Sequence, residues 1–217
     1  MNLKFYVRTT GDRILDNSYS QIDYQLLVDR EHKPIDNFIN ALYTINDEDA
    51  ILLEDDLILC HNFQKEVEKV INANPNRIIN FFQMRLRTTP PCDYDKIVFN
   101  QCTFYPKGIA KQIADIMIEV PRNESTKKNM YSLLENVALE KLNIKVLQYA
   151  PHLVQHLDND TLLFDKTHND RRSMFFLDYL KELNVDYETA LNNQEIRNKL
   201  FSTMRRHFKE LSKEMQT

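Results

Sequence analysis

The fold of this protein is decided by ten residues, Ala50-Ile-Leu-Leu-Glu-Asp-Asp-Leu-Ile-Leu59. The apolar run from Ala50 to Leu53 is typical of a buried strand, and three carboxylates follow it directly. Such a strand predicts the open edge of an α/β sheet, where ligands bind at the carboxyl ends of the strands. Because adjacent carboxylates repel one another, Glu54, Asp55 and Asp56 indicate a divalent-metal site for a phosphate-bearing ligand. The alternative is a solvated acidic turn between two short strands.

The composition is that of an ordinary globular protein. Of the 217 residues 42% are hydrophobic and 28% are charged, which predicts one domain, or one domain with a helical appendage. No apolar run is long enough to cross a membrane and the N-terminus lacks a signal-peptide pattern, so we expect a cytoplasmic protein. The three cysteines, Cys60, Cys92 and Cys102, do not have the spacing of a zinc ribbon or a disulfide framework.

Glycine is scarce, and this excludes several nucleotide-binding classes. The chain contains only Gly11 and Gly108. A dinucleotide fingerprint needs three closely spaced glycines, and a Walker loop needs two before its lysine. NAD-binding Rossmann enzymes and P-loop NTPases are therefore excluded, and the G-x-S-x-G and H-E-x-x-H motifs are also absent. A bound nucleotide would depend on carboxylates and a metal.

Strand-like and helix-like segments alternate along the first half of the chain. Strands are predicted over residues 3–7, 24–28 and 50–53, with a helix over 34–45. This β, α, β order predicts an α/β fold with a mostly parallel sheet flanked by helices. The remaining predicted segments are helices over 63–73 (capped by Asn62), 106–118 and 128–142, strands over 77–83, 97–105 and 144–148, and a turn-rich break over 87–93.

The C-terminal part of the chain has a different character. Residues 173–183 and 195–213 have the periodicity of amphipathic helices. We therefore expect an α/β domain over residues 1–165 and a C-terminal helical extension over 166–217 that packs on it.

Four segments carry a resemblance to a known family. They are Ala50-Ile-Leu-Leu-Glu-Asp-Asp-Leu-Ile-Leu-Cys-His-Asn-Phe63, Phe104-Tyr-Pro-Lys-Gly-Ile-Ala110, Pro151-His-Leu-Val-Gln-His156 and Arg171-Arg-Ser-Met-Phe-Phe176. In order and spacing, over roughly residues 3 to 178, they resemble GT-A glycosyltransferases. The likeness is to lipopolysaccharide-type and small phage-encoded enzymes with an EDD form of the DXD motif. It implies a GT-A (Rossmann-like) fold and metal-dependent transfer of a sugar from a nucleotide-diphosphate sugar to a hydroxyl.

The resemblance implies a metal site for Mn²⁺ or Mg²⁺. Asp55 and Asp56 would hold the ion, which offsets charge on the leaving diphosphate. Glu54 would either contact the ribose of the donor or accept backbone hydrogen bonds. His156 would be a further metal ligand or a donor to phosphate, and its alternative is an exposed loop histidine.

A base is expected on the helix predicted over residues 128–142. Inverting enzymes of the family commonly place an acid, often in an x-E-D pattern, at the start of a helix, where it deprotonates the acceptor hydroxyl. The pattern here is Glu135-Asn136, so Glu135 is the predicted base although the second acid is missing. A helix-surface glutamate without a catalytic role is the alternative.

Nucleotide recognition is expected at the first two strand ends. Arg8-Thr9-Thr10 and Arg13 follow the first strand and could meet base or phosphate, and Asp29 follows the second. Asp29 and the acidic triplet resemble those of UDP-sugar users, which implies a UDP-linked donor. Arg171 and Arg172 could bind phosphate or clamp the C-terminal segment. Solvent exposure without a role is the alternative for each.

The acceptor is left open by the sequence. The phage relatives imply a hydroxymethylated base in DNA, within the cytoplasm of a host, and a surface glycan is the other candidate. The basic side chains of residues 195–213 could follow DNA phosphates or could belong to a solvated helix. Two other functions compete: a non-catalytic GT-A-like module that binds a nucleotide sugar or a partner, and a metal-dependent nuclease.

Overall fold

The computed structural model describes residues 2–83, 92–97, 99–122, 131–157 and 172–214. Its strands are β1 (Leu3–Thr9), β2 (Tyr24–Val28), β3 (Asp49–Glu54), β4 (Leu57–Leu59), β5 (Ile79–Asn80), β6 (Cys92–Tyr94), β7 (Cys102–Tyr105), β8 (Val146–Gln148) and β9 (Val154–His156). Its helices are the 3-10 helix η1 (Asn17–Gln21) and α1 (Pro34–Thr44), α2 (Phe63–Ala73), α3 (Ala110–Glu119), α5 (Tyr131–Lys141), α6 (Leu177–Glu182), α7 (Tyr187–Asn192) and α8 (Gln194–Glu214).

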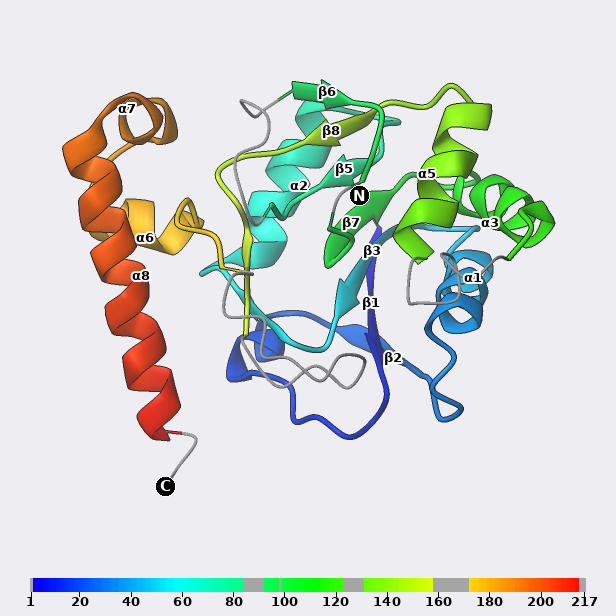
Figure 1. Cartoon of the computed structure of the whole chain (residues 1–217), viewed down its shortest axis with the longest axis horizontal. Coiled ribbons are helices and arrows are strands. Elements are labelled where there is room, and N and C mark those ends of the chain that lie inside the picture. The colour runs from blue at the N-terminus through cyan, green and yellow to red at the C-terminus, as the bar shows by residue number, and fades with distance from the viewer. Residues whose placement is uncertain (1, 84–91, 98, 123–130, 158–171, 215–217) are drawn as a thin grey trace.

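A seven-stranded mixed sheet forms the centre of the molecule, in the order β2-β1-β3-β7-β5-β8-β6 (Figure 1). The pairs β1–β2, β1–β3 and β5–β8 are parallel, whereas β7 is antiparallel to both β3 and β5. The strands β1, β2, β3, β5 and β8 therefore run in one direction, and their carboxyl ends share one edge. This confirms the predicted α/β class with a helix-covered sheet.

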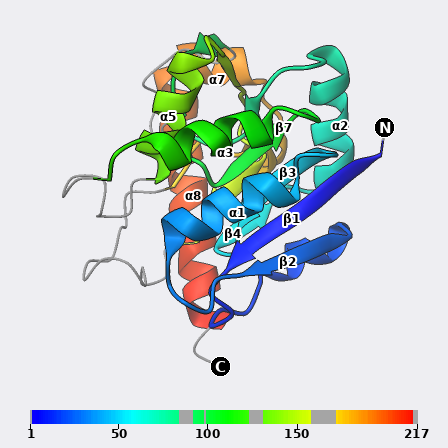
Figure 2. The same ribbon diagram turned by 90° about the vertical axis from the view of Figure 1, so that its right-hand side faces the viewer.

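Helices cover both faces of the sheet because its central strands are apolar on both sides. Along β3, Ala50 and Leu52 belong to one hydrophobic cluster and Ile51 and Leu53 to another. The first cluster includes side chains of α1, α3 and α5. Helix α3 contacts both α1 and α5 (Figure 2). The second includes side chains of α2 and of the C-terminal helices. Burial on both faces explains why the strand is a continuous apolar run.

The C-terminal helices share the second core cluster with the sheet. Leu200, Met204 and Phe208 of α8 are buried in the same cluster as Phe175 and Tyr179. The expected C-terminal helical segment is thus present, and the expected boundary at residue 165 lies outside the described residues. In the described part of the chain, every helix is too short or too polar to cross a bilayer.

Several predicted boundaries were wrong for local reasons. The helix predicted from residue 106 begins only at Ala110, because Gly108 adopts a φ of 86° and donates its N–H to Asn46. The helix predicted from residue 173 begins only at Leu177. Asn62 precedes α2 but is not a side-chain cap, since it has a φ of 59° and makes no capping hydrogen bond.

The strand predictions after α2 also need correction. The strands predicted over 77–83 and 97–105 shrink to β5 and β7. The β5 strand ends where the Asn80 side chain accepts a hydrogen bond from the N–H of Phe82 at 2.9 Å. Residues 92–94, placed in a turn-rich break, form strand β6 on the sheet edge beside β8. The sequence signals also missed β9, which pairs antiparallel with β4 in a separate two-stranded sheet.

Candidate functional site

The acidic triplet lies at the carboxyl edge of the sheet, where two sheets meet. Glu54 ends β3 beside Arg8 of β1. The chain then turns into β4, whose partner β9 places His156 opposite Leu57. The N–H of Leu157 donates to the carbonyl oxygen of Asp56 at 2.7 Å, which extends this pairing to the triplet.

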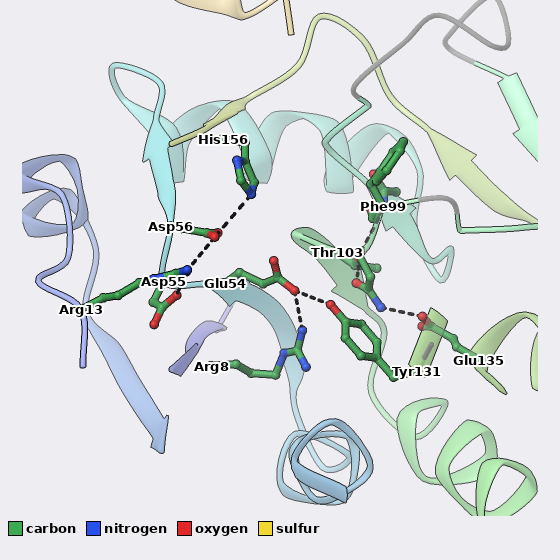
Figure 3. Close-up of polar contacts among 12 residues, drawn as sticks. Arg8, Arg13, Glu54, Asp55, Asp56, Phe99, Thr103, Tyr131, Glu135 and His156 are labelled. Atoms are coloured by element: carbon green, nitrogen blue, oxygen red, sulfur yellow. Dashed lines mark hydrogen bonds and ion pairs between the residues drawn. The ribbon is translucent and has the colours of Figure 1, made fainter. Parts of the chain in front are cut away.

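His156 and Asp56 are neighbours as a result. His156 Nε2 lies 3.3 Å from Asp56 Oδ2, and both side chains are buried (Figure 3). The His156 ring also lies near Phe82, with centroids 6.4 Å apart. An exposed loop histidine was therefore the wrong alternative, and the role of His156 as a metal ligand or a donor to phosphate stays a prediction.

Arg13 is the cation that faces the acids in this structure. Its Nη1 lies 3.0 Å from Asp55 Oδ1 and 2.8 Å from Asp56 Oδ2 (Figure 3). Burial raises the pKa of Asp56, but His156 and Arg13 outweigh it and lower this pKa below its usual value. Among the described residues, Asp56 Oδ1 is buried without a hydrogen-bond partner. One guanidinium nitrogen thus bridges two carboxylates and leaves one oxygen unused.

Glu54 belongs to a different group of contacts. It accepts a hydrogen bond from Arg8 Nη2 at 2.9 Å and another from the hydroxyl of Tyr131 (Figure 3). The Arg8 guanidinium lies 4.8 Å from the Phe38 ring centroid and 4.6 Å from that of Tyr131. The backbone oxygen of Glu54 accepts from the Tyr19 hydroxyl. The donors to the Glu54 carboxylate are thus side chains and not the backbone groups of the expected alternative, and Arg8 is directed at protein groups. Contact of Glu54 with a ribose stays a prediction.

Of the other residues expected at the first two strand ends, Thr9 and Asp29 make hydrogen bonds within the protein. Thr9 Oγ1 accepts from the N–H of Gly11 at 2.9 Å, and the N–H of Asp29 donates to the Thr9 carbonyl at 2.7 Å. Asp29 itself is half-buried at the end of β2. Thr10 Oγ1 is buried with no hydrogen-bond partner in the described residues. Contacts of these groups with a nucleotide stay a prediction.

Glu135 is fully buried rather than exposed on its helix. Its Oε1 accepts from the Tyr105 hydroxyl and its Oε2 from Asn100 Nδ2, both at 2.5 Å. Burial raises the pKa of Glu135 to about 7, although these two hydrogen bonds lower it. Figure 3 shows Glu135 well apart from Asp56, with Tyr131 between them in the view. The helix-surface alternative was wrong, and the catalytic role stays a prediction.

Of the pair Arg171 and Arg172, the structure describes only Arg172. Arg171 lies outside the described residues. The guanidinium of Arg172 lies 3.8 Å from the ring centroid of Phe208, which attaches the residue to α8. Arg172 thus contacts the C-terminal segment through an aromatic ring, and a clamp made by salt bridges and binding of phosphate both stay predictions.

The basic side chains of α8 have protein partners in several cases. Lys199 pairs with Glu195 at 2.8 Å, and Arg206 pairs with Glu182 at 2.5 Å. Arg197 Nη2 donates to Gln194 Oε1 at 2.6 Å. These contacts favour the solvated-helix alternative over a surface that follows DNA phosphates.

Some residues that shape the site were missed by sequence reasoning. Gln155 accepts from the N–H of Ser173 and donates to its carbonyl, both at 2.7 Å, and His152 Nδ1 contacts Ser173 Oγ. Two of the family-like segments are thus bound to each other. Tyr131 and Tyr19 were also missed, because a lone tyrosine carries no signal of its partner.

The donor set at Asp56 fits a divalent cation in chemistry. Ligands of one octahedral Mg²⁺ or Mn²⁺ at about 2.1 Å stand about 3 Å apart when adjacent, close to the 3.3 Å between Asp56 Oδ2 and His156 Nε2. Within the described ranges, no group of three or more His, Cys, Asp or Glu side chains is already arranged around a common point. Asp56 and His156 would hold the ion, and Asp55 would join them once it leaves Arg13.

Comparisons with known proteins give distant likenesses. No protein-family model matches the chain, and no curated protein matches it in sequence. Among solved structures, A197 from STIV is 12% identical with a TM-score of 0.44, over 77% of this chain and 100% of that one. A protein assigned as a glucose-1-phosphate thymidylyltransferase from Bacillus anthracis, solved in complex with a sucrose, is 9% identical with a TM-score of 0.37, over 64% of this chain and 63% of that one.

Proposed function

We propose that this protein is a glycosyltransferase of the GT-A type, which moves a sugar from a nucleotide-diphosphate sugar to a hydroxyl with the help of Mn²⁺ or Mg²⁺. The observation that supports the proposal is the contact between Asp56 and His156, at 3.3 Å on the carboxyl edge of the sheet. These residues lie in two of the four family-like segments, and folding brings them together.

The chain supplies groups for binding a metal and a diphosphate at one edge of the sheet. Asp56 and His156 would hold the cation, which when bound supplies charge compensation for the leaving diphosphate. Asp55 and Arg13 lie directly beside them. Glu54, fixed by Arg8 and Tyr131, orients the start of the turn that carries the two aspartates. Carboxylates and an arginine here take the place of the glycine-rich loops that the sequence lacks.

We further propose that the donor is UDP-linked, on the likeness of Asp29 and the acidic triplet to those of UDP-sugar users. A thermal-shift panel with Mn²⁺ and one nucleotide diphosphate at a time tests this point. UDP should stabilise the protein most, because a ligand that binds only the folded state raises its stability. A much larger shift with another nucleotide would contradict it.

The acceptor is proposed to be a hydroxyl on a glycan or on a hydroxymethylated DNA base. Of these two, the glycan is favoured by α8, whose basic residues Lys199 and Arg206 already pair with acids. A DNA acceptor would also require a base flipped out of the duplex.

A non-catalytic nucleotide-sugar-binding module is the second candidate. One observation favours it: both carboxylate oxygens of Glu135 are occupied within the core, so the predicted base does not face an acceptor. If another group serves as base, the first proposal stands without Glu135.

Donor hydrolysis separates the candidates. The protein is incubated with Mn²⁺ and a panel of nucleotide sugars, and release of nucleotide diphosphate is followed. The transferase should hydrolyse one donor slowly, and Asp56→Ala should abolish the reaction while Arg205→Gln, on the exposed side of α8, leaves it unchanged. Silence across the panel with nucleotide bound would support the binding module. Cleavage of phosphodiesters instead would indicate a nuclease.

A further inference from the structure

Two arginines approach the acidic triplet, and they differ in their exposure to solvent and in their contacts. Arg8 is 7% exposed, pairs with Glu54 at 2.9 Å and lies against the rings of Phe38 and Tyr131. The side chain of Arg13 is 17% exposed and comes from the segment between β1 and η1, next to Ile14, which is 96% exposed. Arg8 packs against two aromatic rings, whereas Arg13 forms ion pairs with two acids and is partly exposed to solvent.

Arg13 lies next to the position that a divalent ion would need. Its Nη1 lies 2.8 Å from Asp56 Oδ2, the same oxygen that lies 3.3 Å from His156 Nε2. An ion ligated by this oxygen and this nitrogen at about 2.1 Å from each would stand within a few ångströms of the guanidinium. A charge of +2 and a charge of +1 at such a distance repel strongly at a half-buried site.

We infer that Arg13 is an exchangeable counter-cation: it neutralises Asp55 and Asp56 before the metal binds, and it moves to the phosphates of the donor when the metal takes its place. The first half concerns the aspartates and Arg13 alone. The second half rests on the proposed function, since it needs a nucleotide diphosphate at this edge.

The exchange follows from the charges of Asp55, Asp56 and Arg13. Without a cation, the buried carboxylates of Asp55 and Asp56 would repel each other, and Arg13 prevents this. A guanidinium released beside a metal-bound diphosphate would find phosphate oxygens, which it binds in a planar, two-pronged fashion. The acids are therefore neutralised in both states, by Arg13 before the metal binds and by the metal afterwards.

The test measures binding in two steps for Arg13→Gln, Arg13→Lys and a control, Arg205→Gln. Mn²⁺ alone is titrated by calorimetry or by the loss of its free EPR signal. UDP is then titrated in saturating Mn²⁺. Arg13→Gln should bind Mn²⁺ at least about tenfold more tightly than the unmodified protein and UDP at least about tenfold more weakly. Arg205→Gln should match the unmodified protein in both steps.

Tighter binding of Mn²⁺ together with weaker binding of UDP by Arg13→Gln would indicate exchange. If Arg13→Gln weakens Mn²⁺ binding or leaves it unchanged, Arg13 does not compete with the metal and the inference is wrong. Should Arg13→Gln fail to fold, Arg13→Lys decides, because a lysine keeps the charge but its shorter side chain holds the ammonium further from the two carboxylates, and it lacks the planar group that binds phosphate. It should bind Mn²⁺ more tightly than the unmodified protein and UDP less tightly, with both changes smaller than those expected for the glutamine.

Failure of the inference and failure of the proposed function give different results. Tighter Mn²⁺ binding by Arg13→Gln in a protein that hydrolyses no donor would support the first half of the inference and count against the transferase. Mn²⁺-dependent hydrolysis with unaltered Mn²⁺ affinity in Arg13→Gln would support the transferase and overturn the exchange.

Discussion

Asp56 Oδ2 lies 3.3 Å from His156 Nε2, although the two residues come from distant parts of the chain. The contact exists because β9 pairs antiparallel with β4 directly after the acidic triplet. It gives the carboxyl edge of the sheet an imidazole that the main sheet does not supply.

Replacement of His156 by glutamine should weaken Mn²⁺ binding at least about tenfold, since outer-shell partners of a metal alone are worth that much. The imidazole nitrogen is lost while a polar group of similar size stays in the buried site. Calorimetric titration of Mn²⁺ measures the change. The matched control is His61→Gln, at an exposed position before α2, which should leave the affinity as it was. Equal Mn²⁺ affinities of the two variants would show that His156 is not a metal ligand.

Replacement of Tyr131 by phenylalanine should lower the free energy of unfolding by about 1.5–3 kcal/mol, the range for a hydrogen bond to a charged group. The reason is that Glu54 would keep only Arg8. Urea denaturation gives the value. The control is Tyr43→Phe, whose hydroxyl donates to Asp115 at the exposed surface at 2.8 Å, and which should cost under about 1 kcal/mol. A similar loss for both variants would show that burial of the Tyr131 contact is not what matters.

Stability should fall as the pH rises through the titration range of Glu135. The pKa of this buried carboxyl is raised to about 7 from an ordinary value of 4.5. Between these values the folded state binds the proton more tightly than the unfolded state, so the contribution is fully present below pH 4.5 and lost as the pH passes about 7. The expected loss is about 3 kcal/mol.

The measurement compares unfolding free energies of the unmodified protein and Glu135→Gln between pH 4.5 and 8. Other groups titrate equally in both, so the difference between the two curves isolates Glu135. Glutamine is neutral throughout, and the gap should close toward low pH and widen toward pH 8 in favour of the variant. Parallel curves would mean that Glu135 is ionised at an ordinary pKa.

Two phenylalanines on α8 should differ sharply on truncation. Phe208 is 6% exposed and packs under Arg172, whereas Phe201 is 47% exposed. Phe208→Ala should cost about 3–5 kcal/mol in unfolding free energy, and Phe201→Ala should cost under about 1 kcal/mol. Urea denaturation of both variants checks this. Equal and small losses would mean that α8 does not share the core of the α/β body.

Much of the α/β body could be predicted from periodicity alone. The strand β3 and the helices α1 and α2 lie within two residues of their predicted ends, because long apolar patterns tolerate few other structures. Short strands such as β6 and β9 could not be predicted, and the strand predicted over 77–83 was longer than β5, since two or three residues carry no period and depend on their partners.

The candidate site was divided in the same way. By itself the sequence determined that three acids follow a buried strand, that glycine loops are missing and that Val154-Gln-His156 exists as a segment. Only the tertiary structure decided that His156 lies beside Asp56 and that Arg13 bridges two acids. It also decided that Glu135 is fully buried in the core. The physical reason is that charge and hydrogen-bond partners act through distances in space, and strand pairing between remote segments sets those distances.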